Sequence, residues 1–130
     1  MEARHQAVST KEAPIPRAPL SQAIIHPNGM IFCSGALGQD PTTHRIVEGP
    51  IGDRTKQALK NLSAVLEAAN SSLEHVIKVN IFMTSMSDIS AVNQVYERFF
   101  VWNPLPARTC VAVKELPNAT DIEIEAVAYP

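Results

Sequence analysis

Four side chains near the C-terminal end of the sequence could take part in chemistry. Arg108 and Cys110 stand two residues apart in one segment, and Glu123 and Glu125 stand two apart in the next. If these segments are β-strands, each pair points to one face, because side chains alternate along a strand. A guanidinium can hold a carboxylate with two parallel hydrogen bonds, and a positioned carboxyl group can deliver or remove a proton.

The same side chains also have simpler explanations. Arg108 could form a surface or interface ion pair with Glu123 or Glu125, and the residues alone favour that ion pair over a ligand. Glu123 could equally be a solvated strand carboxylate. A thiol nucleophile at Cys110 is disfavoured, because no histidine stands beside it in the sequence to activate it.

Other common site types leave no pattern in this sequence. Neither the histidines nor the two cysteines are spaced as metal ligands, and there is no glycine-rich phosphate loop and no nucleophile elbow. We therefore expect no cofactor and no metal, two free thiols, and histidines at the surface. The residues concerned are His5, His26, His44, His75, Cys33 and Cys110.

Composition limits the protein to a few classes. A chain of 130 residues can bury one hydrophobic core, so we expect residues 1–130 to form a single domain. A formal net charge of -2 with scattered basic residues disfavours nucleic-acid binding. No apolar stretch approaches the roughly 20 residues that span a membrane. Glu2 and Glu12 interrupt any basic presequence pattern, and two free thiols fit a reducing compartment, so we predict a cytoplasmic protein, with a mitochondrial location as the alternative.

Proline, glycine and hydrophobic periodicity divide the sequence into elements. Three prolines in Ala13–Leu20 predict an extended linker, and Pro27, Asn28 and Gly29 suit the turn of a β-hairpin. Apolar steps of three and four predict an amphipathic helix at Ile51–Ala69, and the hydroxyl of Ser87 could cap a second helix. The expected strands are His5–Thr10, Gln22–His26, Met30–Ser34, Val76–Thr84, Ala107–Lys114 and Asp121–Tyr129, with a surface connection at Gly35–Gly49 and the second helix at Asp88–Val101.

Helices on one face of a sheet make a two-layer α+β domain. The last strand would place Ile122, Ile124, Ala126 and Ala128 on one face, and Glu123, Glu125, Val127 and Tyr129 on the other. This second face is neither fully polar nor fully apolar. It is therefore either solvated or packed against other subunits.

Several stretches together, within Ala13–Ala128, resemble the Rid (YjgF) family. They are Ser34-Gly35, Asn70–Leu73 leading into Val76–Phe82, Val92–Tyr96, Pro106–Val111, and Leu116-Pro117 followed by Ile122–Ala126. The resemblance implies a chorismate-mutase-like α+β fold that assembles as a homotrimer, with a central barrel of sheets and a ligand cleft at each subunit interface. It also implies hydrolysis of imines derived from enamines such as 2-aminoacrylate to 2-keto acids and ammonia, without a cofactor or metal.

The resemblance assigns roles to particular residues. Arg108 would bind the substrate carboxylate, and Glu123 would deliver water and move the proton. Cys110, Ser34 and Asn93 match positions that line the cleft, although Ser34 and Asn93 could instead be ordinary polar residues. Where the family usually has a tyrosine before a Ser-Gln pair, this sequence has Leu20, and one extra residue separates that pair from Ser34-Gly35.

Two functions of different classes follow from this comparison. The first is a 2-iminobutanoate/2-iminopropanoate deaminase-like hydrolase. The second is a non-catalytic ligand-binding or interaction trimer that keeps Arg108 but has lost efficient turnover, and Leu20 in place of the tyrosine favours it. Ribonuclease activity has been proposed for some family members, but the net charge of this chain argues against it.

Overall fold

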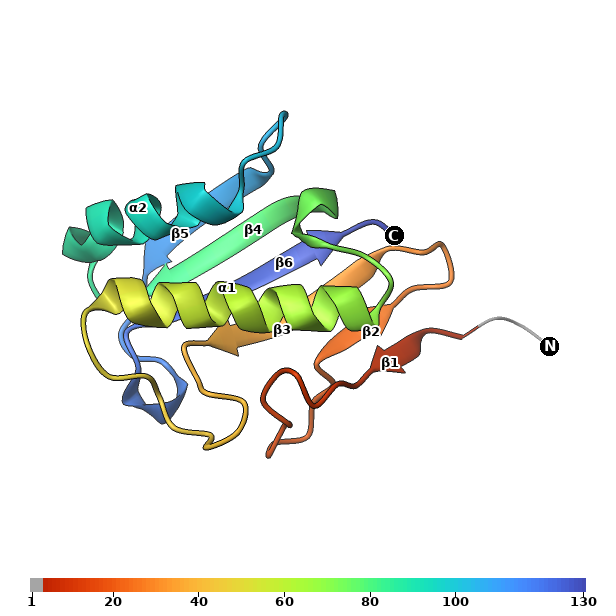
Figure 1. Cartoon of the computed structure of the whole chain (residues 1–130), viewed down its shortest axis with the longest axis horizontal. Coiled ribbons are helices and arrows are strands. Elements are labelled where there is room, and N and C mark those ends of the chain that lie inside the picture. Colours follow the sequence, from red (N-terminus) through yellow and green to blue (C-terminus); the bar gives the residue numbers. More distant parts are fainter. Residues whose placement is uncertain (1–3) are drawn as a thin grey trace.

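The computed structural model describes residues 4–130, which form one mixed sheet with two helices packed on it (Figure 1). The α+β prediction is therefore confirmed. The strands are β1 (Gln6–Val8), β2 (Ala23–Ile25), β3 (Ile31–Leu37), β4 (Val76–Met83), β5 (Ala107–Ala112) and β6 (Ile122–Ala128). The helices are α1 (Ile51–Ala68) and α2 (Ile89–Phe99), with short 3-10 turns η1 (Leu73–His75), η2 (Met86–Asp88) and η3 (Pro117–Ala119).

The strands lie in the order β1-β2-β3-β6-β4-β5. All neighbouring pairs are antiparallel except β4 and β5, which are parallel. Parallel neighbours need a crossover connection, and α2 provides it between β4 and β5. The last strand, β6, inserts between β3 and β4, so the chain ends in the middle of the sheet (Figure 1).

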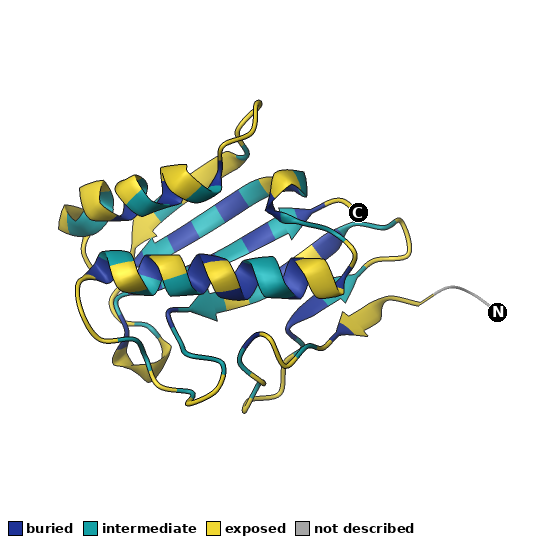
Figure 2. Ribbon diagram, viewed as in Figure 1, coloured by how far each residue is buried: buried dark blue, intermediate teal, exposed yellow. Residues whose placement is uncertain are grey.

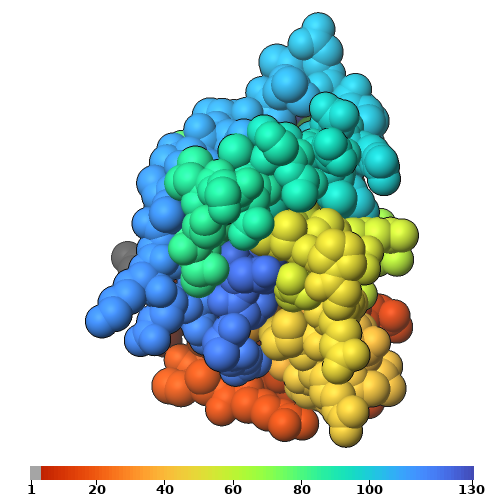
Figure 3. Space-filling view, turned by 90° about the vertical axis from the view of Figure 1, so that its left-hand side faces the viewer, coloured from red at the N-terminus to blue at the C-terminus, as the bar shows by residue number. Residues whose placement is uncertain are grey.

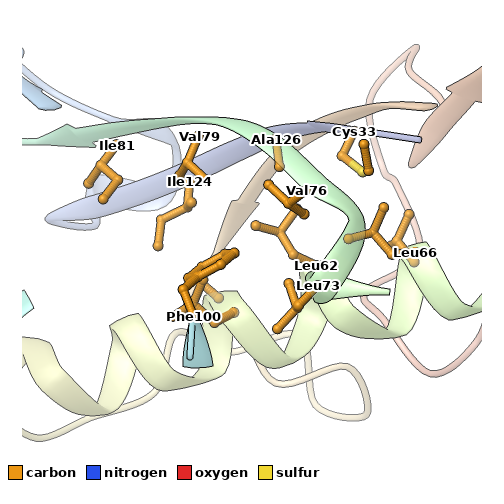
Figure 4. Close-up of a cluster of buried hydrophobic side chains, with 14 of the residues drawn as sticks. Cys33, Leu62, Leu66, Leu73, Val76, Val79, Ile81, Phe100, Ile124 and Ala126 are labelled. Atoms are coloured by element: carbon orange, nitrogen blue, oxygen red, sulfur yellow. The ribbon is translucent and has the colours of Figure 1, made fainter. Parts of the chain in front are cut away.

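The core lies between the helices and one face of the sheet. Along β6, Ile122, Ile124, Ala126 and Ala128 are all buried, as the alternation predicts, while the residues between them are half-buried. Figure 2 shows this alternation as bands along β4 and β6. In Figure 4, side chains from the sheet, among them Val79, Ile124 and Ala126, lie over Leu62 and Leu66 of α1.

Three local expectations need correction. The predicted connection at Gly35–Gly49 begins later, because β3 continues to Leu37. A strict alternation along the predicted strand Val76–Thr84 would put Ile77 on the same face as the buried Val79, but a register shift between Val76 and Lys78 places Val76 in the core and leaves Ile77 45% exposed. Ser87 does not cap α2, because a 3-10 turn precedes the helix and the hydroxyl of Ser85 accepts from the Ser87 amide instead.

The histidines also depart from the expectation of a surface position. His5 and His26 are exposed, but His44 and His75 are half-buried. His75 stacks on Tyr129, with ring centroids 4.4 Å apart. This stacking explains how the imidazole at the end of η1 becomes half-buried.

Candidate functional site

Three of the predicted site residues line one pocket. Leu20 on the proline-rich linker, Ser34 on β3 and Glu123 on β6 border a cavity of about 590 Å³. Other parts of its wall come from α1, from the connection after β3 and from η3. In Figure 3 the gold segment around residue 40 and the orange segment around residue 20 meet at this end of the molecule. Leu20 is 52% exposed, so it stands at the mouth of the pocket.

A buried glutamine holds the linker in place. The side chain of Gln22 accepts a hydrogen bond from the Thr10 amide at 2.7 Å, and donates to the carbonyls of Thr10 at 3.0 Å and Pro14 at 2.9 Å. These bonds replace some of those that the prolines cannot make. The Ser34 hydroxyl donates to the Ser21 carbonyl at 2.6 Å and fixes the other end of the same segment. The linker wall is therefore rigidly anchored.

Glu123 lies directly over Gly35. A β-carbon at Gly35 would approach the Cδ of Glu123 to 2.6 Å, so only glycine leaves room for the carboxyl group. Burial raises the pKa of the Glu123 carboxyl above its ordinary value, and the charge of Glu125 raises it further. A carboxyl group with a raised pKa can hold and release a proton nearer to neutral pH.

The structure separates the two candidate carboxylates. Glu125 pairs with Asn80 in the middle of the sheet and is not part of the pocket wall. Glu123 borders the pocket. Of the two, only Glu123 has the position needed to act on a molecule bound there.

A salt bridge near the pocket joins α1 to the residue just before β6. The guanidinium of Arg54 binds Asp121 through two nitrogen atoms, at 2.7 and 2.8 Å, and donates to the carbonyls of Val47 and Gly49. It thereby ties the connection after β3 to the start of β6, next to Glu123. The distance between these residues in the sequence explains why the pattern alone did not reveal this clamp.

The remaining three predicted site residues form a second group on another part of the molecule. Arg108 and Cys110 lie on β5, the edge strand, and face α2. The Nη1 of Arg108 donates to the Oδ1 of Asn93 at 2.8 Å, and its guanidinium carbon lies 4.8 Å from the ring centroid of Tyr96. Arg108 forms no salt bridge within residues 4–130, where the one ion pair is Arg54–Asp121. The expected alternative, an ion pair with Glu123 or Glu125, is therefore not formed within the chain.

Cys110 has the environment of a packing residue. Its side chain is half-buried against the core, and burial raises the pKa of the thiol, while the nearby Arg108 charge opposes that rise. Cys33 is buried more deeply, which raises its thiol pKa to about 12. Neither environment favours the reactive thiolate.

The two groups do not meet within one chain. On β4, Arg108 is paired with Val79 and Glu123 with Phe82. Because 79 and 82 have opposite parity, the two side chains point to opposite faces of the sheet. They also stand on strands two positions apart, a separation of about 10 Å. One copy of the chain therefore carries two separate half-sites, which we call the carboxyl wall (Leu20, Ser34 and Glu123) and the arginine wall (Asn93, Arg108 and Cys110).

Sequence reasoning missed three residues that position the site. Gln22, Gly35 and Tyr96 appear in the sequence only as parts of motifs. A signal existed for Gly35, since glycine within a strand marks a close approach by another group. Gln22 and Tyr96 act through contacts with residues distant in the sequence, which no local pattern contains.

Residues 4–130 contain neither a metal-binding cluster nor a membrane-spanning helix. No group of three histidine, cysteine, aspartate or glutamate side chains within residues 4–130 is placed to hold a metal ion. Within the same residues, neither helix combines the length and the apolar run that crossing a membrane requires.

Known proteins resemble this chain in both sequence and structure. The family model described as Endoribonuclease L-PSP matches residues 10–130. A 2-iminobutanoate/2-iminopropanoate deaminase of Dermatophagoides farinae is 42% identical over 120 residues, covering 92% of each chain. The solved structure of YyfA from Yersinia pestis, a protein of the conserved Rid family, superposes with a TM-score of 0.93 at 37% identity, covering 97% of this chain and 99% of that one. Escherichia coli TdcF, solved with bound serine, gives a TM-score of 0.89 at 32% identity, covering 96% and 98%.

Proposed function

The chain belongs to the endoribonuclease L-PSP family, which includes the Rid (YjgF) proteins, and we propose that it hydrolyses small carboxylate-bearing imines to 2-keto acids and ammonia. The proposed substrates are of the 2-iminobutanoate and 2-iminopropanoate type, the latter derived from 2-aminoacrylate. The observation that carries the proposal is the Glu123 carboxyl group, which borders a pocket and has a raised pKa. The deaminase named among the relatives supports the same chemistry.

The arginine wall would recognise the substrate. Arg108 is exposed, carries a positive charge without a salt-bridge partner among residues 4–130, and keeps donors free besides the Nη1 that binds Asn93. A guanidinium with two free N–H groups matches a carboxylate in a bidentate geometry. TdcF binds serine, a small molecule that also carries a carboxylate. Cys110 would complete this wall as a neutral packing group.

The carboxyl wall would carry out the chemistry. In the proposed reaction, Glu123 takes a proton from a water molecule as the water oxygen adds to the imine carbon, and it passes this proton to the imine nitrogen, which gives a carbinolamine. Glu123 then carries the hydroxyl proton of the carbinolamine to its nitrogen, the C–N bond breaks, and the nitrogen leaves as ammonia. The carbon keeps the oxygen of the added water as the keto group. These steps are an addition, proton transfers and an elimination without any redox change, so the proposed reaction uses no cofactor or metal.

We further propose that neighbouring copies of the chain assemble as a homotrimer that unites the two walls. The sheet face opposite the helices carries exposed Phe32 and Val111 beside half-buried Phe82 and Val127, which gives a second copy apolar surface to cover. In this arrangement the carboxyl wall of one subunit faces the arginine wall of the next. The proposed function involves neither nucleic acid nor a membrane. We propose that the protein acts in the cytoplasm.

A second candidate is a non-catalytic trimer that binds carboxylates. Leu20 favours it, because an aliphatic side chain at the pocket mouth offers no hydrogen bond to a substrate or to water. The two candidates differ in turnover but share carboxylate binding.

The release of ammonia and keto acid tests the proposed function. Threonine dehydratase generates the imine in situ, and the purified chain should accelerate the appearance of 2-oxobutanoate well above the spontaneous rate. Glu123→Gln serves as the matched control. A wild-type rate equal to that of the control, with carboxylate binding intact, would favour the second candidate.

A further inference from the structure

We propose that Tyr96 is a positioning residue whose aromatic ring forms the platform on which Arg108 is held ready for the substrate carboxylate. This inference rests on the proposed function, because it concerns how the arginine wall recognises its ligand. It goes beyond that function by assigning a role to a residue that lies under the guanidinium.

The platform belongs to one face of α2. Asn93 and Tyr96 are three residues apart, so their side chains lie on the same side of the helix, and Phe100, the residue directly after its end, stacks on Tyr96. Asn93 binds Nη1 of Arg108, and Tyr96 lies beneath the guanidinium carbon at 4.8 Å. The guanidinium of Arg108 is therefore held at one nitrogen by Asn93 and across its flat face by Tyr96.

The ring itself cannot move freely. Tyr96 is 8% exposed and stacks on Phe100, with ring centroids 4.5 Å apart and an angle of 27° between the planes. Phe100 is also buried, so the stack is fixed in the core. Arg108 stands on an edge strand and is itself exposed, so it depends on this buried support to keep one orientation.

Both supports are uncharged, and this matters for binding. A carboxylate partner would hold the guanidinium as firmly, but it would neutralise the charge and compete with the substrate. An aromatic face attracts a cation through its quadrupole and leaves the edge of the guanidinium free. The amide oxygen of Asn93 likewise accepts one hydrogen bond without removing the positive charge.

The experiment compares variants of the intact protein. Tyr96→Phe keeps the ring, Tyr96→Leu removes it, and Phe99→Leu is the matched control, since it removes another partly buried ring of α2 that belongs neither to the stack nor to the contact with Arg108. For Tyr96→Leu we expect the KM for the imine and the Kd for the stable probe 2-oxobutanoate to rise about two- to thirtyfold, with a smaller change in kcat. Tyr96→Phe should stay within about twofold of wild type.

Two measurements keep the test decisive if Tyr96→Leu folds poorly. The first is a series of phenylalanines at position 96 with increasing fluorination, which weakens the ring quadrupole while keeping its shape, so the Kd for 2-oxobutanoate should rise stepwise. The second is the Nε–H signal of Arg108 in a proton–nitrogen spectrum, assigned by its loss in Arg108→Lys. This signal should be shifted by the ring in wild type, Tyr96→Phe and Phe99→Leu, and should lose that shift in Tyr96→Leu.

The outcomes separate this inference from the proposed function. An Arg108 signal and a Kd that do not respond to fluorination or to loss of the ring would overturn the platform. If the wild type binds 2-oxobutanoate and both quantities follow the ring, but no imine is hydrolysed, the platform stands and the proposed function fails.

Discussion

The carboxyl wall and the arginine wall are built by opposite means. Glu123 is packed over Gly35, in a pocket whose linker is tied down by the buried side chain of Gln22. Arg108 stands exposed on the edge strand and, within residues 4–130, is oriented by uncharged groups of α2. Close packing perturbs the pKa of the carboxyl group, whereas exposure keeps the full charge of the arginine available. The difference fits two tasks, proton transfer at one wall and carboxylate capture at the other.

The sharpest test of this contrast is the loss of the Glu123 carboxyl group. Glu123→Gln keeps the size of the side chain but cannot exchange a proton, so we expect kcat to fall about 10²- to 10⁴-fold. The Kd for 2-oxobutanoate should change little, because the carboxylate is bound by the other wall. Glu125→Gln is the control on the same face, and it should retain most of the activity. A similar loss in both variants would mean that Glu123 has no special role.

Mixing two inactive variants tests whether the walls meet between subunits. Glu123→Gln keeps an intact arginine wall, and Arg108→Ala keeps an intact carboxyl wall. If each site takes one wall from each of two neighbouring subunits, a site is complete when the Arg108→Ala subunit supplies its carboxyl wall and the Glu123→Gln subunit supplies its arginine wall. In random mixed trimers this holds for about a quarter of the sites, so about a quarter of the wild-type activity should return. Co-refolding the two variants and assaying ammonia release measures this.

The same experiment has clear contrary outcomes. If the activity of the mixture stays at the level of the separate variants, the carboxyl wall of one subunit and the arginine wall of the next do not form a shared site. Light scattering on the wild type should give the mass of three chains, and a monomer at micromolar concentration would remove the shared site altogether.

A smaller effect is expected when the arginine wall keeps its charge but loses its shape. Arg108→Lys replaces a planar fork by an ammonium group, and it also gives up the flat contact with Tyr96. Because a charge-assisted hydrogen bond is worth about 1.5 to 3 kcal/mol, kcat/KM should fall roughly ten- to a hundredfold. The assembly should remain unchanged by light scattering. Wild-type kcat/KM in this variant would exclude Arg108 as the carboxylate anchor.

Much of the fold could be predicted from the sequence because its patterns are local. The burial of Ile122, Ile124, Ala126 and Ala128 follows from a period of two along β6, and the core face of α1 follows from a period of 3.6. The exposed Ile77 could not be predicted in this way. Its orientation depends on a register shift against β6, a strand about fifty residues later in the sequence.

The site residues could be chosen by resemblance, but not their grouping. Whether Arg108 and Glu123 share a face depends on how β5 and β6 each pair with β4, and that pairing is a long-range choice of the fold. The alternation within each strand predicted the internal pairs correctly, such as Arg108 with Cys110. It contained no information on which pairs face each other across the sheet.

Leu20 offers a change within the carboxyl wall that should alter selectivity more than rate. An aliphatic side chain at the pocket mouth makes this wall drier and wider than a tyrosine would, so the imine from threonine should be processed at least as well as the smaller one from serine. Leu20→Tyr should shift the ratio of kcat/KM toward the smaller imine by about ten- to a hundredfold, since a methylene in an apolar pocket is worth about 1 to 3 kcal/mol. An unchanged ratio would place Leu20 outside the working cleft.

The smallest expected effect concerns stability, and it tests whether the carboxyl wall is as desolvated as its packing indicates. The pKa of Glu123 is raised above 4.5 in the folded protein, so just above that value the folded state holds a proton that the unfolded state has released. Stability must then fall as the pH rises from the unfolded-state pKa through the folded-state pKa of Glu123, and the penalty is fully present above the latter. Glu123→Gln lacks this penalty, so its Tm should exceed that of the wild type at pH 7, and the gap should narrow as the pH falls toward 4.5. Glu125→Gln removes the second cause of the raised pKa but leaves the burial, so its gap should be smaller than that of Glu123→Gln. Melting curves of the three proteins from pH 4 to pH 8 measure the gap, and parallel curves would mean that Glu123 is as well solvated as Arg108, which would erase the contrast between the two walls.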